Sequence, residues 1–193
     1  MSRLLRAVNQ LVNFWLTGCA RVLKPPGSDG YSCRVDEVRL DPMTVAEFDD
    51  RLPSLMHAYV AEQIRAGNWG SADADELAQL EQRRLLPRGF ATPGMHWYVA
   101  RTAANQVVGY LWLATEPSDP RAGAAWLYAI EVESDWRGRG VGHRLLDAAE
   151  VEAQRLGAAS LALNVFGDNR IARRLYESSG YEVTSLQMRK PLT

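Results

Sequence analysis

Apolar residues in the second half of the chain follow first a strand pattern and then a helical one. Residues 124–132 are almost continuously apolar, which predicts a central strand covered on both faces, although Glu131 interrupts the run. Apolar positions then recur every three or four residues up to Gly157, a typical helix stop. The elements predicted for this half are a strand over 124–132, a helix over 140–156, a strand over 161–165, a helix capped by Asp168 or Asn169 and ended at Gly180, and a final strand over 181–188.

The first half begins with an alternating segment and two amphipathic stretches. Thr44 and Glu47 have the spacing of a capping box, so a helix should start there and be bent or restarted near Pro53. Two stretches rich in Trp, Tyr and Val follow, with a short polar link between them, which predicts a β-hairpin. The elements predicted for this half are a strand over 35–40, a helix from 44 to 67, a helix capped by Ser71 or Asp73 and ended by Pro87, and hairpin strands over 96–101 and 107–115.

The order of these elements predicts an α+β fold with helices on both faces of one sheet. The chain has 193 residues, of which 47% are hydrophobic and 23% charged, which is an ordinary globular composition. We therefore expect a single domain over residues 35–193 with a full apolar core. The sequence contains no internal repeat.

Residues 1–31 are predicted to be a separate amphipathic helix with a linker. Basic residues and no acids lie beside an apolar face at spacings of three and four, and Pro25 ends the pattern. Three interpretations stay open. Residues 3–23 dock on the domain or on a second copy in a homodimer, they lie on a membrane surface, or they are a secretory signal that resembles a lipoprotein leader. A fourth is that translation starts at Met43 or that the segment is disordered.

Charge and cysteine content exclude several classes of protein. The formal net charge is −1, so no overall basic surface for nucleic acid is expected. Cys19 and Cys33 form no CxxC pair, and His57, His96 and His143 have no ligand spacing, so no metal is expected. A chain without a disulfide framework fits a cytoplasmic setting. No apolar run is long enough to span a membrane.

The loop over residues 137–142 carries the strongest chemical signal. Gly138, Gly140 and Gly142 leave the backbone open between a predicted strand and a predicted helix, and Arg137 and Arg139 add positive charge. Amide groups at a helix N-terminus bind phosphate well. The dinucleotide pattern GxGxxG and the Walker pattern are both absent. The loop by itself therefore indicates either an anion site or a tight turn.

A second segment gives this loop a context. The run Val132-x-x-x-x-Arg137-x-x-Gly140-x-Gly142, followed by Asn169-x-x-Ala172-x-x-Leu175-Tyr176-x-x-x-Gly180-Tyr181, resembles the GCN5-related N-acetyltransferase (GNAT) superfamily. The resemblance is sharp over residues 126–188 and does not cover residues 1–31. It implies a mixed, mostly antiparallel sheet of six to seven strands. It also implies an acyl-CoA-dependent N-acetyltransferase.

The same resemblance implies where acetyl-CoA binds. The strand before the loop parts from its neighbour, and the pantetheine arm pairs with backbone groups of Ile130, Glu131 and Val132. The pyrophosphate lies on the loop and the start of the helix, and Asn169 contacts the cofactor or caps the last helix. The implied pyrophosphate residues are Arg137, Gly138, Arg139, Gly140, Val141, Gly142 and His143.

Two residues are candidates for proton transfer. Tyr176 matches the family tyrosine that protonates the leaving thiolate, and a core tyrosine at the end of an amphipathic helix is the less favoured alternative. Glu131 lies in an apolar run, and burial would raise its pKa and suit it as the base for the attacking amine. In some family members a glutamate at the position of Asn164 is the base, and the asparagine here favours a water relay.

The implied reaction is direct transfer of an acetyl group from acetyl-CoA to a primary amine in a ternary complex. The acceptor is a small-molecule amine or a protein amine, bound by the first helices and the loops. A non-catalytic acyl-CoA-binding sensor is the alternative. It would bind the cofactor without turnover on any amine.

Overall fold

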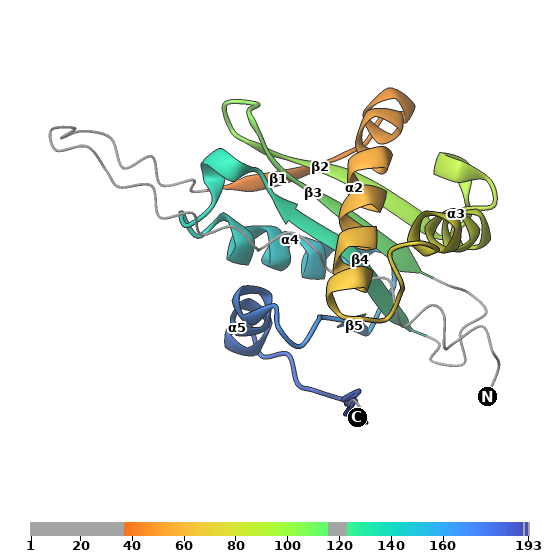
Figure 1. The fold of residues 1–193 in the computed structure, drawn as a ribbon. Coiled ribbons are helices and arrows are strands. Elements are labelled where there is room, and N and C mark those ends of the chain that lie inside the picture. The colour runs from red at the N-terminus through yellow and green to blue at the C-terminus, as the bar shows by residue number, and fades with distance from the viewer. Residues whose placement is uncertain (1–36, 116–122, 191, 193) are drawn as a thin grey trace, which may run out of the picture.

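The computed structural model describes residues 37–115, 123–190 and 192, and its centre is one five-stranded sheet in the order β1-β2-β3-β4-β5 (Figure 1). β1 to β4 are antiparallel neighbours, and β5 is parallel to β4. The strands are β1 (Val38–Pro42), β2 (Met95–Thr102), β3 (Val107–Thr115), β4 (Ala124–Val132) and β5 (Ser160–Leu163). The helices are α2 (Val45–Arg65), α3 (Ala74–Leu85), α4 (Val141–Arg155) and α5 (Arg170–Ser178), with 3-10 turns η1 (Gly89–Ala91) and η2 (Ser134–Trp136).

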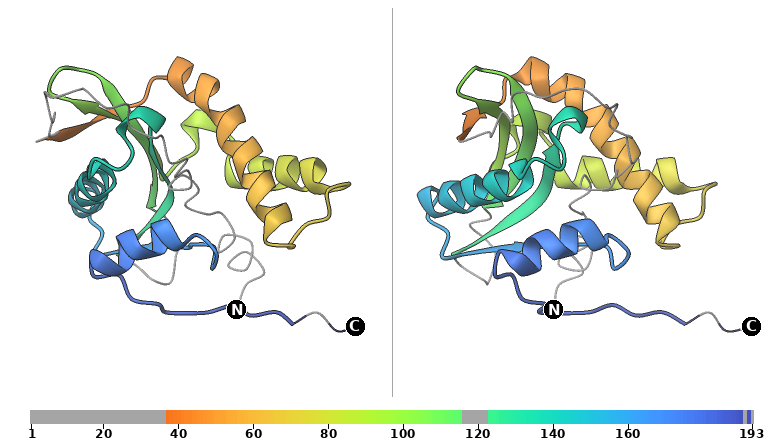
Figure 2. Two further views of the ribbon diagram at one scale, coloured as in Figure 1. Left: turned by 60° about the vertical axis from the view of Figure 1, so that its left-hand side comes forward. Right: turned by 90° about the vertical axis from the view of Figure 1, so that its left-hand side faces the viewer.

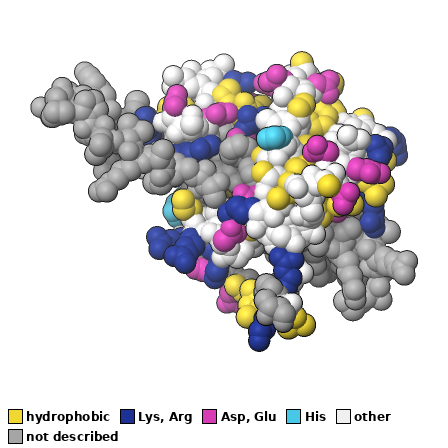
Figure 3. All heavy atoms as spheres, viewed as in Figure 1, with side chains coloured by type: hydrophobic (Ala, Val, Ile, Leu, Met, Phe, Trp, Pro, Cys, Tyr) yellow, Lys and Arg dark blue, Asp and Glu magenta, His cyan; other side chains and the backbone are white. Residues whose placement is uncertain are grey.

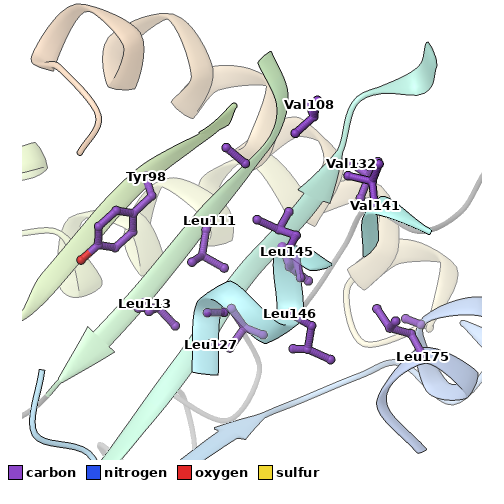
Figure 4. Close-up of a cluster of buried hydrophobic side chains, with 14 of the residues drawn as sticks. Tyr98, Val108, Leu111, Leu113, Leu127, Val132, Val141, Leu145, Leu146 and Leu175 are labelled. Atoms are coloured by element: carbon purple, nitrogen blue, oxygen red, sulfur yellow. The ribbon is translucent and has the colours of Figure 1, made fainter. Parts of the chain in front are cut away.

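Helices cover both faces of the sheet, as the sequence predicts (Figure 2). One face packs against α4 and α5, and its core is formed by aliphatic side chains that interdigitate between sheet and helices (Figure 4). The other face packs against α2 and α3 and is largely aromatic. The largest residues of the aliphatic core are Leu111, Leu113, Leu127, Ile130, Leu145 and Leu146, each at most 1% exposed.

A bulge in β4 decides how this strand presents its side chains. The register with β3 pairs Trp112 with Ala129 but Leu113 with Leu127, so Tyr128 is the extra residue. Tyr128 and Ala129 consequently both belong to the α2 face. The Tyr128 ring stacks on Trp112 with a centroid distance of 4.6 Å. The bulge also lies where pairing of β4 with β5 stops, at Leu127.

Most of the predicted elements are confirmed. The hairpin, the strand over 124–132 and the helices after the glycine loop and after Asn169 lie where the patterns put them. Of the two outcomes predicted near Pro53, the restart is wrong, because α2 runs without interruption from Val45 to Arg65. Pro53 is exposed, whereas Phe48 and Ala58 on either side of it are buried, so packing on the sheet holds both halves in one helix.

The prediction of six to seven strands is also wrong for the described residues, which contain five. The final strand expected over 181–188 is extended backbone without a sheet partner, and residues 182–190 are exposed. Strand propensity creates a strand only where another backbone is available for pairing. The predicted helix over residues 1–31 lies outside the described residues.

The capping box at the start of α2 makes a prediction about stability. The Thr44 hydroxyl accepts from the Glu47 amide at 3.2 Å, and the Glu47 carboxylate accepts from the Thr44 amide at 2.8 Å. Thr44→Ala should lower the free energy of unfolding by about 1 kcal/mol, measured by urea denaturation. Asp73→Ala is the matched control, since the Asp73 side chain makes no capping bond at the start of α3. An equal loss in both variants would contradict the assignment.

Candidate active site

β4 and β5 part halfway along β4, and this opening is the centre of the site. Residues Ala124 to Leu127 pair with Ser160 to Leu163, and β4 then continues for five residues to Val132. From Ala129 to Val132 no strand of the described residues pairs with β4 on the β5 side, whereas β3 continues to pair with it on the other side. The backbone edge of β4 at Ile130 and at the Val132 amide is therefore open to a ligand that lies between the strands, while the Val132 carbonyl accepts from Arg137 Nε.

The opening leads to the N-terminus of α4. Gly140 is the N-cap residue of this helix, in a left-handed conformation with φ 79°, and no side chain caps the helix. Arg144 is the first residue whose amide bonds back into the helix, to the Gly140 carbonyl at 3.5 Å. The amides of Val141, Gly142 and His143 precede it, and they are the helix-start donors that need an outside acceptor. This geometry suits an anion.

The glycine loop before α4 is exposed and unobstructed. Gly138 has φ 72°, and a Cβ atom added at Gly138 or Gly140 would meet nothing within 4 Å. Arg139 is exposed, and its guanidinium lies 5.4 Å from the centre of the Trp136 ring. Arg137 turns back and donates from Nε to the Val132 carbonyl at 2.9 Å. Arg137 thereby fixes the loop to the end of β4, while Arg139 stays at the surface.

Two further residues predicted to bind the cofactor lie at the ends of helices. Asn169 is 2% exposed, and its Oδ1 accepts from the Ala172 amide at 3.0 Å, so it is the N-cap of α5. The capping role expected for Asn169 is thus confirmed. His143 is exposed on the first turn of α4, and its Nε2 lies 3.1 Å from the Ser178 hydroxyl of α5. The contact between His143 and Ser178 joins α5 to the start of α4.

Tyr176 of α5 is buried, with 3% of its surface exposed, and belongs to the core on the α4 and α5 face. Its hydroxyl has no hydrogen-bond partner among the described residues. Burial, with a smaller contribution from Tyr181, raises the pKa of Tyr176, so the phenol stays protonated at neutral pH. A buried hydroxyl without a partner is unusual in proteins and points to a ligand that supplies one.

Glu131 is buried on the opposite face of β4, where Arg51 of α2 contacts its carboxylate. Arg51 also lies 3.8 Å from the Glu133 carboxylate and 4.1 Å from the centre of the Tyr110 ring. Burial raises the pKa of Glu131, and Arg51 works in the opposite direction. The site therefore holds a buried carboxylate on the α2 face and a protonated phenol on the α5 face, with the opening between them.

The sequence patterns missed the α2 residues that border this site. Arg51 and Arg65 are fourteen residues apart, close to four helical turns, so both project from one face of α2. Arg51 contacts Glu131 at the end of β4, and Arg65 contacts Asp168 in the loop after β5. α2 is therefore tied to both sides of the opening. No motif marks either arginine, because their partners lie 80 and 103 positions away in the sequence.

The described residues, 37–115, 123–190 and 192, contain no group of three or more His, Cys, Asp or Glu side chains arranged to hold a metal ion. None of their helices combines the length and the apolar character needed to cross a bilayer.

The sheet thus opens beside the uncapped N-terminus of α4 and near the buried hydroxyl of Tyr176. The family model described as "Acetyltransferase (GNAT) family" matches residues 53–181. The chain therefore belongs to the GNAT acetyltransferase family, and it is an N-acetyltransferase. The matched range includes the opening, the glycine loop, Asn169 and Tyr176.

Known relatives agree with this assignment. The chain is 34% identical over 155 residues to YycN of Bacillus subtilis, named an uncharacterized N-acetyltransferase, with 80% of this chain and 99% of YycN covered. The crystal structure of YycN matches with a TM-score of 0.76, covering 81% and 99% of the two chains. A mycothiol acetyltransferase of Propionibacterium freudenreichii is 30% identical over 152 residues, which are 79% of this chain but 44% of that protein.

Proposed function

We propose that this protein transfers an acetyl group from acetyl-CoA to a primary amine by direct attack within a ternary complex. The observation that carries the proposal is the open backbone edge of β4, which ends at the uncapped N-terminus of α4. A linear amide-containing arm fits the edge as an added strand would, and a pyrophosphate fits the helix end. Coenzyme A joins these two groups in one molecule.

The donor-binding residues follow from this placement. The pantetheine arm pairs with the backbone of Ile130 and Val132, and the pyrophosphate accepts from the amides at the start of α4. Arg139 is exposed beside the loop, where it adds positive charge for the phosphates. Asn169 contributes through the side-chain atoms that its capping bond leaves available.

The acceptor ammonium loses two protons in this reaction and the sulfur gains one. The first ammonium proton passes to Glu131, directly or through water, because Glu131 lies on the α2 face from which the acceptor approaches. The amine then attacks the thioester carbonyl, a C–N bond forms, and the C–S bond breaks. Tyr176 donates its phenolic proton to the departing thiolate, which supplies its buried hydroxyl with a partner, and the second proton released by the nitrogen restores the phenol.

An assay of turnover tests the proposal. Purified protein is incubated with acetyl-CoA and a panel of small-molecule and peptide amines, and release of the coenzyme A thiol is followed. Turnover with at least one amine is the expected result. Cofactor binding without turnover would support a non-catalytic acyl-CoA sensor. An absence of binding at millimolar acetyl-CoA would refute the assignment of the donor.

Gly140→Ala should weaken acetyl-CoA binding by about tenfold, measured as Kd by calorimetry. The left-handed backbone at Gly140 costs a residue with a Cβ atom about 1–2 kcal/mol, so the loop shifts and its amides move away from the pyrophosphate. Gly70→Ala is the matched control, because Gly70 has no positive φ and open space around a Cβ atom. Equal Kd values for both variants would remove the loop from the cofactor site.

A further inference from the structure

Glu62 of α2 is a buried acid to which the proposed reaction gives no role. The residue is 6% exposed. Arg65, one turn further along α2, contacts its carboxylate, yet no group of the described chain donates an aligned hydrogen bond to Oε2. A buried carboxylate is costly unless ion pairs and hydrogen bonds together replace its lost water. Glu62 therefore lacks a donor at Oε2 that a ligand can supply.

The cation that contacts Glu62 has a second partner outside α2. One guanidinium nitrogen of Arg65 contacts Glu62, and the other contacts Asp168 in the loop after β5. The side chains of Arg65 and Asp168 are both about half exposed, so solvent reaches this part of the cluster. Arg65 can therefore leave Glu62 and stay paired with Asp168. Glu62 is thus able to exchange Arg65 for an incoming cation.

Glu62 lies on the same face of α2 as Arg51, which contacts the proposed base Glu131. The two α2 residues are eleven positions apart, close to three helical turns, and their Cα atoms are about 16 Å apart along the helix axis. Leu55 and Ala58 lie between them on this face, the first half-buried and the second buried. One side of the opening therefore presents a carboxylate at Glu131, an apolar stretch, and a second carboxylate at Glu62.

The helices on the two faces of the sheet differ in charge. α2 and α3 together contain seven acidic residues and four arginines, a net charge of −3 with His neutral. α4 and α5 contain four acidic residues and five arginines, a net charge of +1. Figure 3 views the molecule from the α2 side, where acidic side chains (magenta) lie over α2 and α3. An acidic layer attracts a cationic acceptor, whereas the basic layer suits the phosphates of the donor.

We propose that Glu62 determines acceptor specificity by binding a second cationic nitrogen, and that the acceptor is a linear amine with two positive charges. This inference rests on the proposed function and names its substrate class. One nitrogen of the acceptor reaches Glu131 and is acetylated, and the methylene chain lies along Leu55 and Ala58. The second nitrogen replaces Arg65 on Glu62 and supplies the donor that Oε2 lacks.

Acceptors matched in length test this assignment by release of the coenzyme A thiol. Linear diamines from 1,4-diaminobutane to 1,10-diaminodecane are each compared with the monoamine and the ω-amino acid of the same length. The wild-type kcat/KM should be about tenfold higher for the best diamine than for its monoamine, and lowest for the amino acid. Glu62→Gln should abolish the preference by raising KM for the diamine. Glu76→Gln, the same change at an exposed glutamate of α3, should keep it.

Arg65→Gln tests the same site in the opposite direction. Loss of the competing cation should strengthen the preference for the diamine, and an unchanged preference would contradict the exchange even if Glu62→Gln failed to fold. Equal kcat/KM for diamine and monoamine in the wild type, or a preference that survives in Glu62→Gln, would overturn the role of Glu62 and leave acetyl transfer standing. Calorimetric titration with the same diamines reads binding without turnover. Diamine binding that depends on Glu62, with no amine acetylated, would keep the cation site and refute the proposed reaction.

Discussion

Tyr176→Phe should lower kcat by about 100-fold at neutral pH, with Kd for acetyl-CoA changed less than about twofold. The phenylalanine keeps the ring in the core but cannot protonate the thiolate. The hydroxyl makes no hydrogen bond to the described residues, so its loss should leave Tm unchanged or slightly higher. Stopped-flow thiol release and calorimetric titration of acetyl-CoA measure the two constants.

Tyr181→Phe is the matched control for this prediction. Tyr181 lies next to Tyr176 with its ring centre 5.7 Å away, and burial raises its pKa as well. It lies after α5 and outside the proposed path of the proton. Its variant should keep kcat within about twofold. Equal losses in the two variants, or full activity in Tyr176→Phe, would remove Tyr176 from the role of acid.

Arg51→Met should lower the free energy of unfolding by about 3 kcal/mol at neutral pH, because it leaves the buried Glu131 carboxylate without its cation. The loss should depend on pH in a defined direction. Since the pKa of Glu131 is raised in the fold, folding takes up a proton, and stability falls as the pH rises above 4.5, the ordinary value for glutamate. Removal of Arg51 raises this pKa further, so the loss should shrink as the pH falls toward 4.5. Urea denaturation across this range measures it.

A double-mutant cycle separates the contribution of the Arg51–Glu131 ion pair to stability from that of the other contacts of α2. Glu131→Gln should restore most of the stability lost in Arg51→Met, because no charge then remains to be buried. Glu131→Gln alone should slow acyl transfer by about 100-fold if the carboxylate takes the proton of the acceptor. Additive losses of stability would show that Arg51 acts through Tyr110 or through helix packing and not through Glu131. Normal turnover in Glu131→Gln would assign the base elsewhere.

Local sequence patterns were sufficient to predict an element wherever neighbouring residues alone determine its structure. The hairpin follows from residues of high strand propensity, β4 from a nearly continuous apolar run, and α4 from apolar residues at helical spacing. The glycine loop could be predicted for the same reason, since the left-handed backbone at Gly138 and Gly140 requires residues without a Cβ atom. Tyr176 and Asn169 were found through the motif around them.

The sequence by itself thus determined the order of the elements, the anion loop and the candidate acid. Only the tertiary structure decided at which residue β4 parts from β5, that Arg51 contacts Glu131, and that residues 181–190 have no strand partner in the described sheet. The physical reason is the range of the interaction. Turns, caps and periodicity are fixed by neighbouring residues, whereas strand pairing and buried ion pairs join segments whose distance in the sequence says nothing about their distance in space.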